Sequence, residues 1–200
     1  MRVGDSMKKK LNKLAILASG NGTTLQAIID SIKNNKLNST IKIVISNTED
    51  AFALKRAKEA DIKTYVLKDY KDEEELYNIL KEANIDLVVL AGYLKLIPVK
   101  VIKEFTIINT HPALLPKFGG KGMYGMNVHR AVVDNHEKVT GATLHFVNEE
   151  YDKGKIISQT KVKVLKNDTA EDVSARVQAA EKIQIVKVLN DFANGLIDIA

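Results

Sequence analysis

The sequence predicts an α/β protein: a single domain with a doubly wound, mostly parallel sheet, an antiparallel hairpin at the sheet edge and a long C-terminal helix. Short apolar runs of strand length alternate with helix-periodic segments through most of the 200-residue chain. This alternation is typical of a parallel sheet covered by helices on both faces. Two extended segments and a long helical pattern then follow. A chain of this length holds one sizeable core.

The parallel strands are expected where short apolar runs end at polar or turn residues. They are Leu14–Ser19, Ile41–Ser46, Thr64–Leu67, Leu87–Ala91 and Ile107–Thr110. Between them, two sets of apolar residues repeat at the i, i+3, i+4, i+7 spacing of one helical face. These sets are Leu25, Ile28, Ile29 and Ile32, and Leu76, Ile79, Leu80 and Ala83.

The pattern changes after Pro112. The segment Lys117–Gly125 holds four glycines, and Asn127–Asn135 looks helical. Two extended segments follow, Thr143–Val147 and Ile156–Val164. The short turn-like link between these two segments predicts an antiparallel hairpin at the sheet edge.

The last helix is expected to start after Thr169. Val173, Val177 and Ala180 begin its apolar pattern, which continues to Gly195, where a glycine cap would end it. The folded domain is thus expected to span residues 13–200, after a basic N-terminal tail at residues 1–12.

Composition excludes several classes of function. Lys and Asp interrupt every apolar run, so no membrane span is expected. The absence of cysteine excludes disulfides, thiolate zinc sites and cysteine nucleophiles, and it fits a cytoplasmic location. The net charge of +5 is spread among acids and forms no basic stripe, so we expect an anionic small molecule rather than a nucleic acid as partner.

A glycine-containing loop joins the first predicted strand to the first predicted helix. It comprises Ser19–Thr24, and a helix N-terminus after such a loop favours a phosphate. A dinucleotide-binding loop is the alternative, but Leu25 stands where that motif has its third glycine. A tight turn without any ligand also remains open.

Asn109 and His111 are the most informative polar pair. Alternation along an extended strand places both on one face, at the carboxyl end where ligands of open α/β sheets gather. An amide can donate to a developing oxyanion, and an imidazole can donate a proton or a charge-assisted hydrogen bond. A purely structural role for the pair stays open on these residues alone.

Asp152 would support a catalytic role if it came near His111. A nearby carboxylate raises the pKa of an imidazole and favours its protonated form. An Asp shortly before Gly154 is equally ordinary as a turn residue, so the contact is a hypothesis at this point.

Five motifs follow one another in the region that runs from about Lys13 to the C-terminus. They are SGNG at Ser19–Gly22, LAGYLKLI at Leu90–Ile97, NTHPALLP at Asn109–Pro116, TGATLHFVNEEYDKG at Thr140–Gly154 and ARVQAAE at Ala175–Glu181. Together and in this order, they resemble the phosphoribosylglycinamide formyltransferase family.

The resemblance implies a Rossmann-like formyltransferase domain that moves a formyl group from 10-formyltetrahydrofolate to the amine of glycinamide ribonucleotide in purine biosynthesis. Asn109, His111 and Asp152 match the catalytic trio of this family. It further implies that Asn109 and a protonated His111 stabilise the oxyanion while Asp152 keeps His111 charged and oriented. Substrates would be small molecules, no metal is expected, and the protein would be a monomer or weak homodimer.

The same resemblance assigns the binding residues. The ribonucleotide would be held by Gly22, Thr23, Thr24 and Glu181. The folate would be enclosed by Leu94, Lys95, Leu96, Ile97, Asn109, Val147, Asn148 and Asp152. His145 would contact the catalytic side chains rather than the substrate, or it would serve a purely structural role.

Some residues depart from the family pattern. Thr24 stands where many members have Asn, Lys95 where many have Arg, and Glu74 where some place an Arg against the folate glutamate tail. Lys68 or Lys71 could replace that last contact. The stretch Gly119–Met126 is longer and richer in glycine than in some relatives, which predicts a mobile loop near the substrate.

Three other functions compete. A formyltetrahydrofolate deformylase would give the formyl group to water, but that family has an N-terminal regulatory domain and only about a dozen residues precede the first strand here. A methionyl-tRNA formyltransferase would need a C-terminal tRNA-binding domain. A non-catalytic nucleotide-binding module is the third alternative, since fold alone does not fix function.

Overall fold

The structure, a computed structural model, describes residues 9–198, so most of the predicted basic tail at residues 1–12 lies outside the described residues. A seven-stranded sheet has the order β3-β2-β1-β4-β5-β6-β7. Its strands are β1 (Lys13–Leu17), β2 (Thr40–Ser46), β3 (Thr64–Val66), β4 (Leu87–Leu90), β5 (Ile107–His111), β6 (Val139–Phe146) and β7 (Ile156–Lys163). The helices are α1 (Thr23–Lys33), α2 (Phe52–Glu59), α3 (Glu73–Glu82), α4 (Val99–Glu104), α5 (Met126–Asp134) and α6 (Ala170–Ala193).

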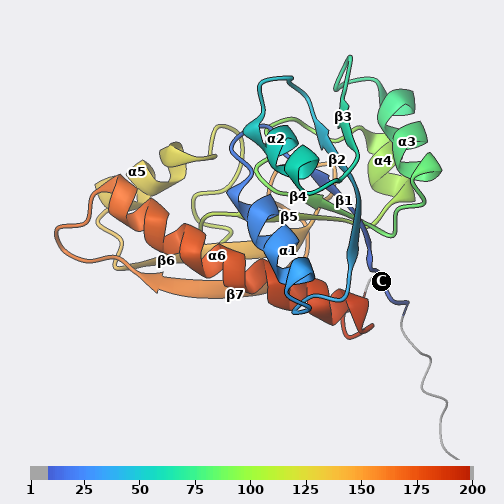
Figure 1. Ribbon diagram of the computed structural model, residues 1–200. Coiled ribbons are helices and arrows are strands. Elements are labelled where there is room, and N and C mark those ends of the chain that lie inside the picture. Colours follow the sequence, from blue (N-terminus) through green and yellow to red (C-terminus); the bar gives the residue numbers. More distant parts are fainter. Residues whose placement is uncertain (1–8, 199–200) are drawn as a thin grey trace, which may run out of the picture.

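The sheet confirms the predicted topology (Figure 1). Strands β1 to β5 pair in parallel, while β6 pairs antiparallel with both β5 and β7. The hairpin therefore lies at the sheet edge, as expected. Strand β6 starts at Val139, four residues before the expected start at Thr143, and α2 and α4 are additional to the helices that the sequence predicted.

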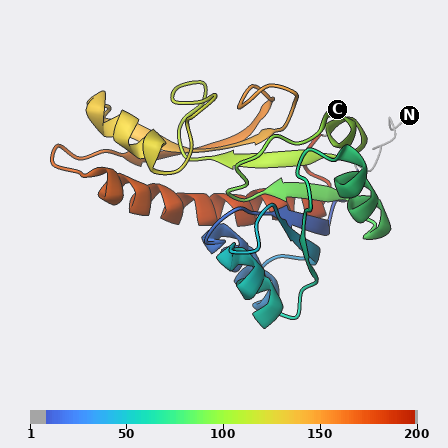
Figure 2. The same cartoon turned by 90° about the horizontal axis from the view of Figure 1, so that it is seen from above.

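Side chains of β1 alternate between two apolar cores. Leu14 and Ile16 face a core shared with α1, α2 and α6, whereas Ala15 and Leu17 face a core shared with α3 and α4. Helices thus cover both faces of the sheet, which Figure 2 shows in the view from above. This doubly wound arrangement is what the alternation of strands and helices predicted.

Helix α6 begins and ends where the sequence predicts. Thr169 and Asp172 form a capping box at its start, because each side chain binds the backbone N–H of the other residue. After its end, Gly195 has a φ of 67°, a conformation that glycine adopts without strain. The helix lies along the sheet beside α1, which brings Glu181 next to the start of α1.

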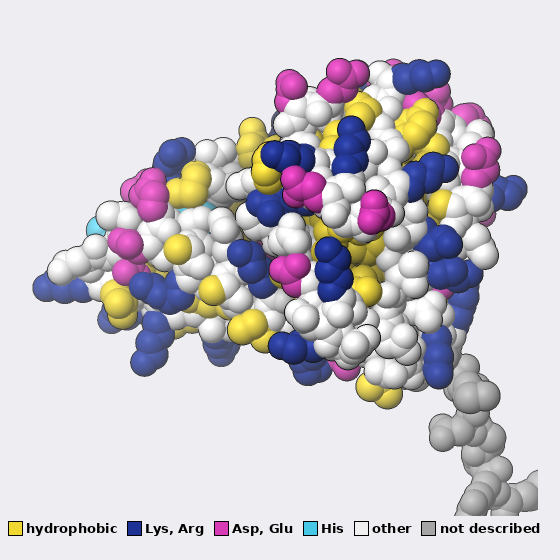
Figure 3. All heavy atoms as spheres, in the orientation of Figure 1, with side chains coloured by type: hydrophobic (Ala, Val, Ile, Leu, Met, Phe, Trp, Pro, Cys, Tyr) yellow, Lys and Arg dark blue, Asp and Glu magenta, His cyan; other side chains and the backbone are white. Residues whose placement is uncertain are grey.

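Two further findings concern the ends and surface of the chain. Leu11 is buried and its backbone N–H donates to Phe192, so the folded part begins before the predicted boundary at residue 13. On the face drawn in Figure 3, lysines and arginines are interspersed with acidic side chains. Across residues 9–198, none of the helices has the length and apolar character needed to cross a membrane.

Candidate active site

Strand β5 places Asn109 and His111 on one face of the sheet. Ile107 packs in the core beneath α3 and α4, and Ile108 packs in the opposite core. Alternation then directs Asn109 and His111 to the side of Ile107, and directs Thr110 to the side of α1 and α6. Asn109 contacts His145, His111 lies beside Asp152, and His145 and Asp152 lie 3.5 Å apart, so the structure confirms the predicted shared face.

Asp152 lies beside both histidines at this edge. Its Oδ2 is 3.6 Å from His111 Nδ1, and its Oδ1 is 3.5 Å from His145 Nε2. The backbone N–H of Gly120 donates to Asp152 Oδ2 at 2.8 Å. The predicted contact between Asp152 and His111 is therefore present, in addition to contacts that the sequence did not reveal.

His145 orients the amide of Asn109. His145 Nδ1 lies 2.8 Å from the carbonyl oxygen of Phe146, and because a carbonyl only accepts, Nδ1 donates there. His145 Nε2 can then accept from Asn109 Nδ2, which is 3.1 Å away. One N–H of the Asn109 amide is held in this way, and the second N–H is free to donate to a ligand.

His111 is enclosed by acceptors. Its Nε2 donates to the carbonyl oxygen of Phe118 at 2.7 Å, while Nδ1 faces the Asp152 carboxylate. Burial lowers the pKa of His111 below its ordinary value, and the opposing effects of Asp152 and Phe118 do not overcome it. This direction contradicts the expectation that Asp152 keeps His111 protonated at neutral pH, because desolvation of the ring outweighs the effect of the carboxylate.

Asp152 itself is ionised at neutral pH. Burial raises the pKa of this carboxyl group, but the His145 ring 3.5 Å away, the hydrogen bond from the Gly120 N–H and the field of His111 lower it by more, so the net shift is downward. A fixed negative charge therefore stands beside a neutral imidazole that can become a cation during a reaction.

The loop before α1 offers backbone N–H groups to a ligand. Gly22 caps the helix with a φ of 70° and no side chain caps it, so the first N–H groups of α1 have no partner from a cap. A Cβ at Gly22 would lie 2.7 Å from that of Ala53, so only glycine fits there. This geometry suits a phosphate group.

Glu181 is buried beside this loop. Its Oε1 accepts a hydrogen bond from Thr24 Oγ1 at 2.7 Å. Burial raises the pKa of the Glu181 carboxyl group above its ordinary value, against the smaller effects of Thr24, Lys182 and Thr110. A ligand group that donates hydrogen bonds or carries positive charge would offset the cost of burying this carboxylate.

Three adjoining cavities surround these residues. The loop cavity, about 330 Å³, is lined by the Gly20–Thr24 loop together with Thr110, His129, Ser174, Gln178 and Glu181, among others. The central cavity, about 380 Å³, contains Asn109, His111, Asp152 and the segment Gly120–Gly125. The hairpin cavity, about 60 Å³, is lined by Lys95, Leu96, Ile97, Asn109, His145, Val147, Asn148 and Asp152, among others.

The central cavity joins the other two. It shares Leu94 and Thr110 with the loop cavity, and it shares Asn109 and Asp152 with the hairpin cavity. The predicted ribonucleotide residues Gly22, Thr23, Thr24 and Glu181 thus line one side, and all predicted folate residues except Leu94 line the other. Asn109, His111 and Asp152 lie where the two sides meet.

An outer groove of about 520 Å³ continues from the hairpin cavity. It is lined by Tyr70, Lys71, Lys95, Tyr151 and neighbouring residues. The ammonium groups of Lys95 and Lys71 lie 4.8 Å and 5.7 Å from the centre of the Tyr70 ring. Glu74 is instead occupied by an ion pair with Lys100. Lys71 rather than Lys68 therefore lines the groove.

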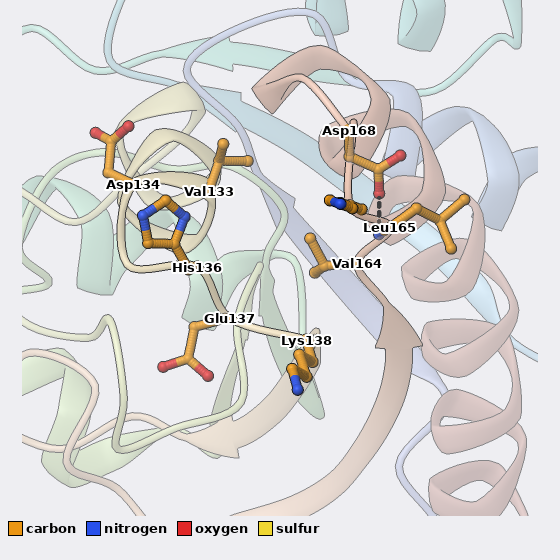
Figure 4. Close-up of a pocket in the computed structure, with 9 residues that line it drawn as sticks. Val133, Asp134, His136, Glu137, Lys138, Val164, Leu165 and Asp168 are labelled. Carbon is orange, nitrogen blue, oxygen red and sulfur yellow. Dashed lines mark hydrogen bonds between the residues drawn. The ribbon is translucent and has the colours of Figure 1, made fainter.

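A further cavity, about 760 Å³, lies between the end of α5 and the segment that leads into α6 (Figure 4). Two of its acids are already engaged, since Glu137 pairs with Lys117 and Asp168 with Arg176. None of the predicted site residues lines it. Among residues 9–198, no group of three or more His, Asp or Glu is arranged to hold a metal ion.

Several residues of the site escaped the sequence analysis. Phe118 and Gly120 act through backbone atoms, which leave no signal in side-chain patterns. Thr110 lies between two predicted site residues, and His129 lies on α5. A polar residue within the apolar pattern of a helix was the one available signal for His129, which is 2% exposed.

Comparison with known proteins agrees with this geometry. The formyl transferase family model matches residues 12–189. Phosphoribosylglycinamide formyltransferase of Escherichia coli is 38% identical over 91% of this chain and 87% of that protein. The chloroplastic phosphoribosylglycinamide formyltransferase of Arabidopsis thaliana is 39% identical over 93% of this chain, which spans 67% of that longer protein.

Solved structures give the same result. Glycinamide ribonucleotide transformylase 1 from Symbiobacterium toebii superimposes with a TM-score of 0.87 at 34% identity, over 95% of this chain and 91% of that one. Phosphoribosylglycinamide formyltransferase from Anaplasma phagocytophilum also reaches a TM-score of 0.87, at 35% identity over 96% and 91% of the two chains. The chain therefore belongs to the formyl transferase family, among the phosphoribosylglycinamide formyltransferases that transfer a formyl group in purine biosynthesis.

Proposed function

We propose that the protein uses Asn109, His111 and Asp152 to transfer the formyl group of 10-formyltetrahydrofolate to the amine of 5′-phosphoribosylglycinamide. One observation carries the proposal: the trio lies where the central cavity joins the loop cavity to the hairpin cavity. A formyl donor and a phosphorylated amine bound on the two sides would meet beside these three side chains.

The loop cavity is suited to the ribonucleotide. Its phosphate would bind the free N–H groups at the start of α1, next to Gly22 and Thr23. Glu181 would bind the sugar or glycinamide part, since its buried carboxylate accepts hydrogen bonds and Thr24 already engages one oxygen. This arrangement directs the amine away from the loop and toward Asn109.

The folate ring system is assigned to the hairpin side, where the hairpin cavity of about 60 Å³ adjoins the central cavity and the outer groove. Residues Lys95–Ile97 and Val147–Asn148 line the hairpin cavity. The outer groove continues from it past Lys71 and Lys95, whose positive charges would attract the carboxylates of the glutamate tail. The donor's formyl carbon would then lie near Asn109 and Asp152.

The reaction would proceed through a tetrahedral intermediate. The amine nitrogen bonds to the formyl carbon, and the carbonyl oxygen becomes an oxyanion that accepts from the free N–H of Asn109 and from His111. Breaking the bond between carbon and N10 of the folate restores the carbonyl, while the proton lost by the amine passes to that nitrogen. The N-formylated ribonucleotide and tetrahydrofolate then leave.

The charge of His111 would change during this cycle. The ring is neutral at rest because burial lowers its pKa, with Nε2 donating to the Phe118 carbonyl. A nascent oxyanion nearby raises the proton affinity of the ring, and the Asp152 carboxylate 3.6 Å from Nδ1 stabilises the resulting cation. His111 could therefore take up the amine proton and release it to the leaving nitrogen.

The decisive experiment mixes purified protein with 10-formyltetrahydrofolate, with and without glycinamide ribonucleotide, and follows absorbance of the deformylated folate. Amine-dependent product is expected. Product that forms equally well without the amine would show transfer of the formyl group to water and contradict the proposal. The variant Asp168→Asn, whose substitution lies outside the three cavities of the site, is prepared and assayed in the same way as the control.

A further inference from the structure

Two buried polar atoms beside the loop cavity have no hydrogen bond of ordinary geometry. They are Nδ1 of His129, a residue only 2% exposed, and Oγ1 of Thr110, which lies close enough to Glu181 to lower the pKa of that carboxyl group. Both residues line the loop cavity. Buried polar side chains in folded proteins are usually hydrogen-bonded, because an unpartnered group loses its contact with water without compensation. These two atoms therefore mark a place where a ligand completes the structure.

The neighbouring polar groups of the cavity already have partners. Thr24 donates to Glu181, and Gln178 donates to Ser174. His129 and Thr110 approach the cavity from different elements, since His129 lies on α5 and Thr110 on β5. A ligand that reached both would span the space between the helix N-terminus at Gly22 and the catalytic strand.

The chemistry of the two groups favours hydroxyls over a phosphate. Burial lowers the pKa of His129, and the nearby His111 lowers it further, so the ring is neutral at pH 7. A neutral ring offers one donor and one acceptor, and Thr110 offers a hydroxyl. Sugar hydroxyls both donate and accept, whereas a phosphate dianion requires donors.

We propose that His129 and Thr110 bind the ribose hydroxyls of the amine substrate, and thereby hold its amine beside Asn109. The inference rests on the proposed function, because it assigns the sugar of that substrate to this side of the loop cavity. It adds two binding residues that act through direct contact with the ligand. One of them, Thr110, stands between the two catalytic residues of β5 but faces the opposite side of the sheet.

Conservative variants separate contact from packing. Thr110→Val removes the hydroxyl and keeps the branched shape, and Thr110→Ser keeps the hydroxyl. His129→Ala removes the ring, whereas His129→Asn places an amide near the position of Nδ1. His136→Asn is the matched control, because His136 follows the same helix, is exposed and lines the distant cavity.

Two probes separate the sugar from the phosphate. Titration calorimetry with ribose 5-phosphate and with methyl phosphate measures binding without any catalysis. Thr110→Val and His129→Ala should weaken ribose 5-phosphate binding by roughly three- to tenfold each, the loss of one hydrogen bond, and should leave methyl phosphate binding unchanged. Thr110→Ser, His129→Asn and His136→Asn should stay within about twofold of the unaltered protein.

Steady-state kinetics provide the second readout. The KM for glycinamide ribonucleotide should rise in Thr110→Val and His129→Ala, and the KM for 10-formyltetrahydrofolate should not. Unchanged ribose 5-phosphate binding in both variants would overturn the inference, as would an equal loss for methyl phosphate, which would show that the residues shape the phosphate loop. Absence of amine-dependent transfer by the unaltered protein would instead refute the proposed function. The calorimetry does not depend on transfer, so the two failures can be told apart.

Discussion

Replacing Asp152 by asparagine keeps the size of the side chain and removes the charge that faces His111. The side chains of His111 and Asp152 are 4% and 11% exposed, and 3.6 Å separates Nδ1 from Oδ2. At an effective dielectric constant of about 20, unit charges at that distance interact by about 5 kcal/mol. This sets an upper limit of roughly 10³- to 10⁴-fold on the rate enhancement that the charge supplies once His111 becomes a cation.

The measured effect should be somewhat smaller. Asparagine can still accept from the Gly120 N–H through its carbonyl oxygen, so the loop stays attached. We expect kcat for Asp152→Asn to fall by roughly 10²- to 10³-fold, with little change in the KM of either substrate. Initial rates of amine-dependent folate release measure both constants.

A control with the same substitution shows whether the effect is local. Asp168 is also a buried acid, since its side chain is 7% exposed and binds Arg176, but it lies at the distant end of α6. Asp168→Asn should lower the melting temperature and leave kcat unchanged. A kcat for Asp152→Asn within threefold of that of the control would refute the electrostatic role assigned to Asp152.

Three further predictions concern the binding residues. Glu181→Gln should raise the KM for the ribonucleotide and also raise the melting temperature at pH 7. The reason is that burial raises the pKa of this carboxyl group, so the group stabilises the fold below its ordinary pKa of 4.5 and loses that contribution as pH rises. An unchanged melting temperature in a calorimetric scan would contradict this. Gly22→Ala should weaken ribonucleotide binding at least tenfold in titration calorimetry, since its Cβ would meet Ala53; wild-type affinity would argue against the phosphate loop. Lys71→Ala should raise the KM for polyglutamylated folate more than for the monoglutamate, and equal effects on both would remove Lys71 from the tail contact.

Most of the sheet could be predicted because buried parallel strands are continuous apolar runs with clear ends. The helices were harder to predict. In α2 the buried face consists of Ala53, Leu54 and Ala57, and the two small residues give a weak periodic signal. Helix α4 has six residues, too few to show a period. Both were missed for these reasons.

Some features of the site could likewise be predicted from the sequence, and others could not. The shared face of Asn109 and His111 follows from strand geometry, and the structure confirms it. The contact with Asp152 was a hypothesis that depended on how the hairpin folds back. The lowered pKa of His111 could not be foreseen, because it depends on the burial of the ring under the loop that carries Phe118 and Gly120. Such loops adopt positive φ angles that local sequence patterns specify poorly.

The central claim is that Asn109 and His111 together bind the oxyanion while Asp152 stabilises the charge on His111. A crystal structure with glycinamide ribonucleotide and a tetrahedral analogue of the transferred carbon tests it most directly. We predict an analogue oxygen at roughly 2.7–3.1 Å from both Asn109 Nδ2 and His111 Nε2, in the place now taken by the Phe118 carbonyl oxygen. An analogue oxygen bound elsewhere, with His111 Nε2 still donating to Phe118, would contradict the account.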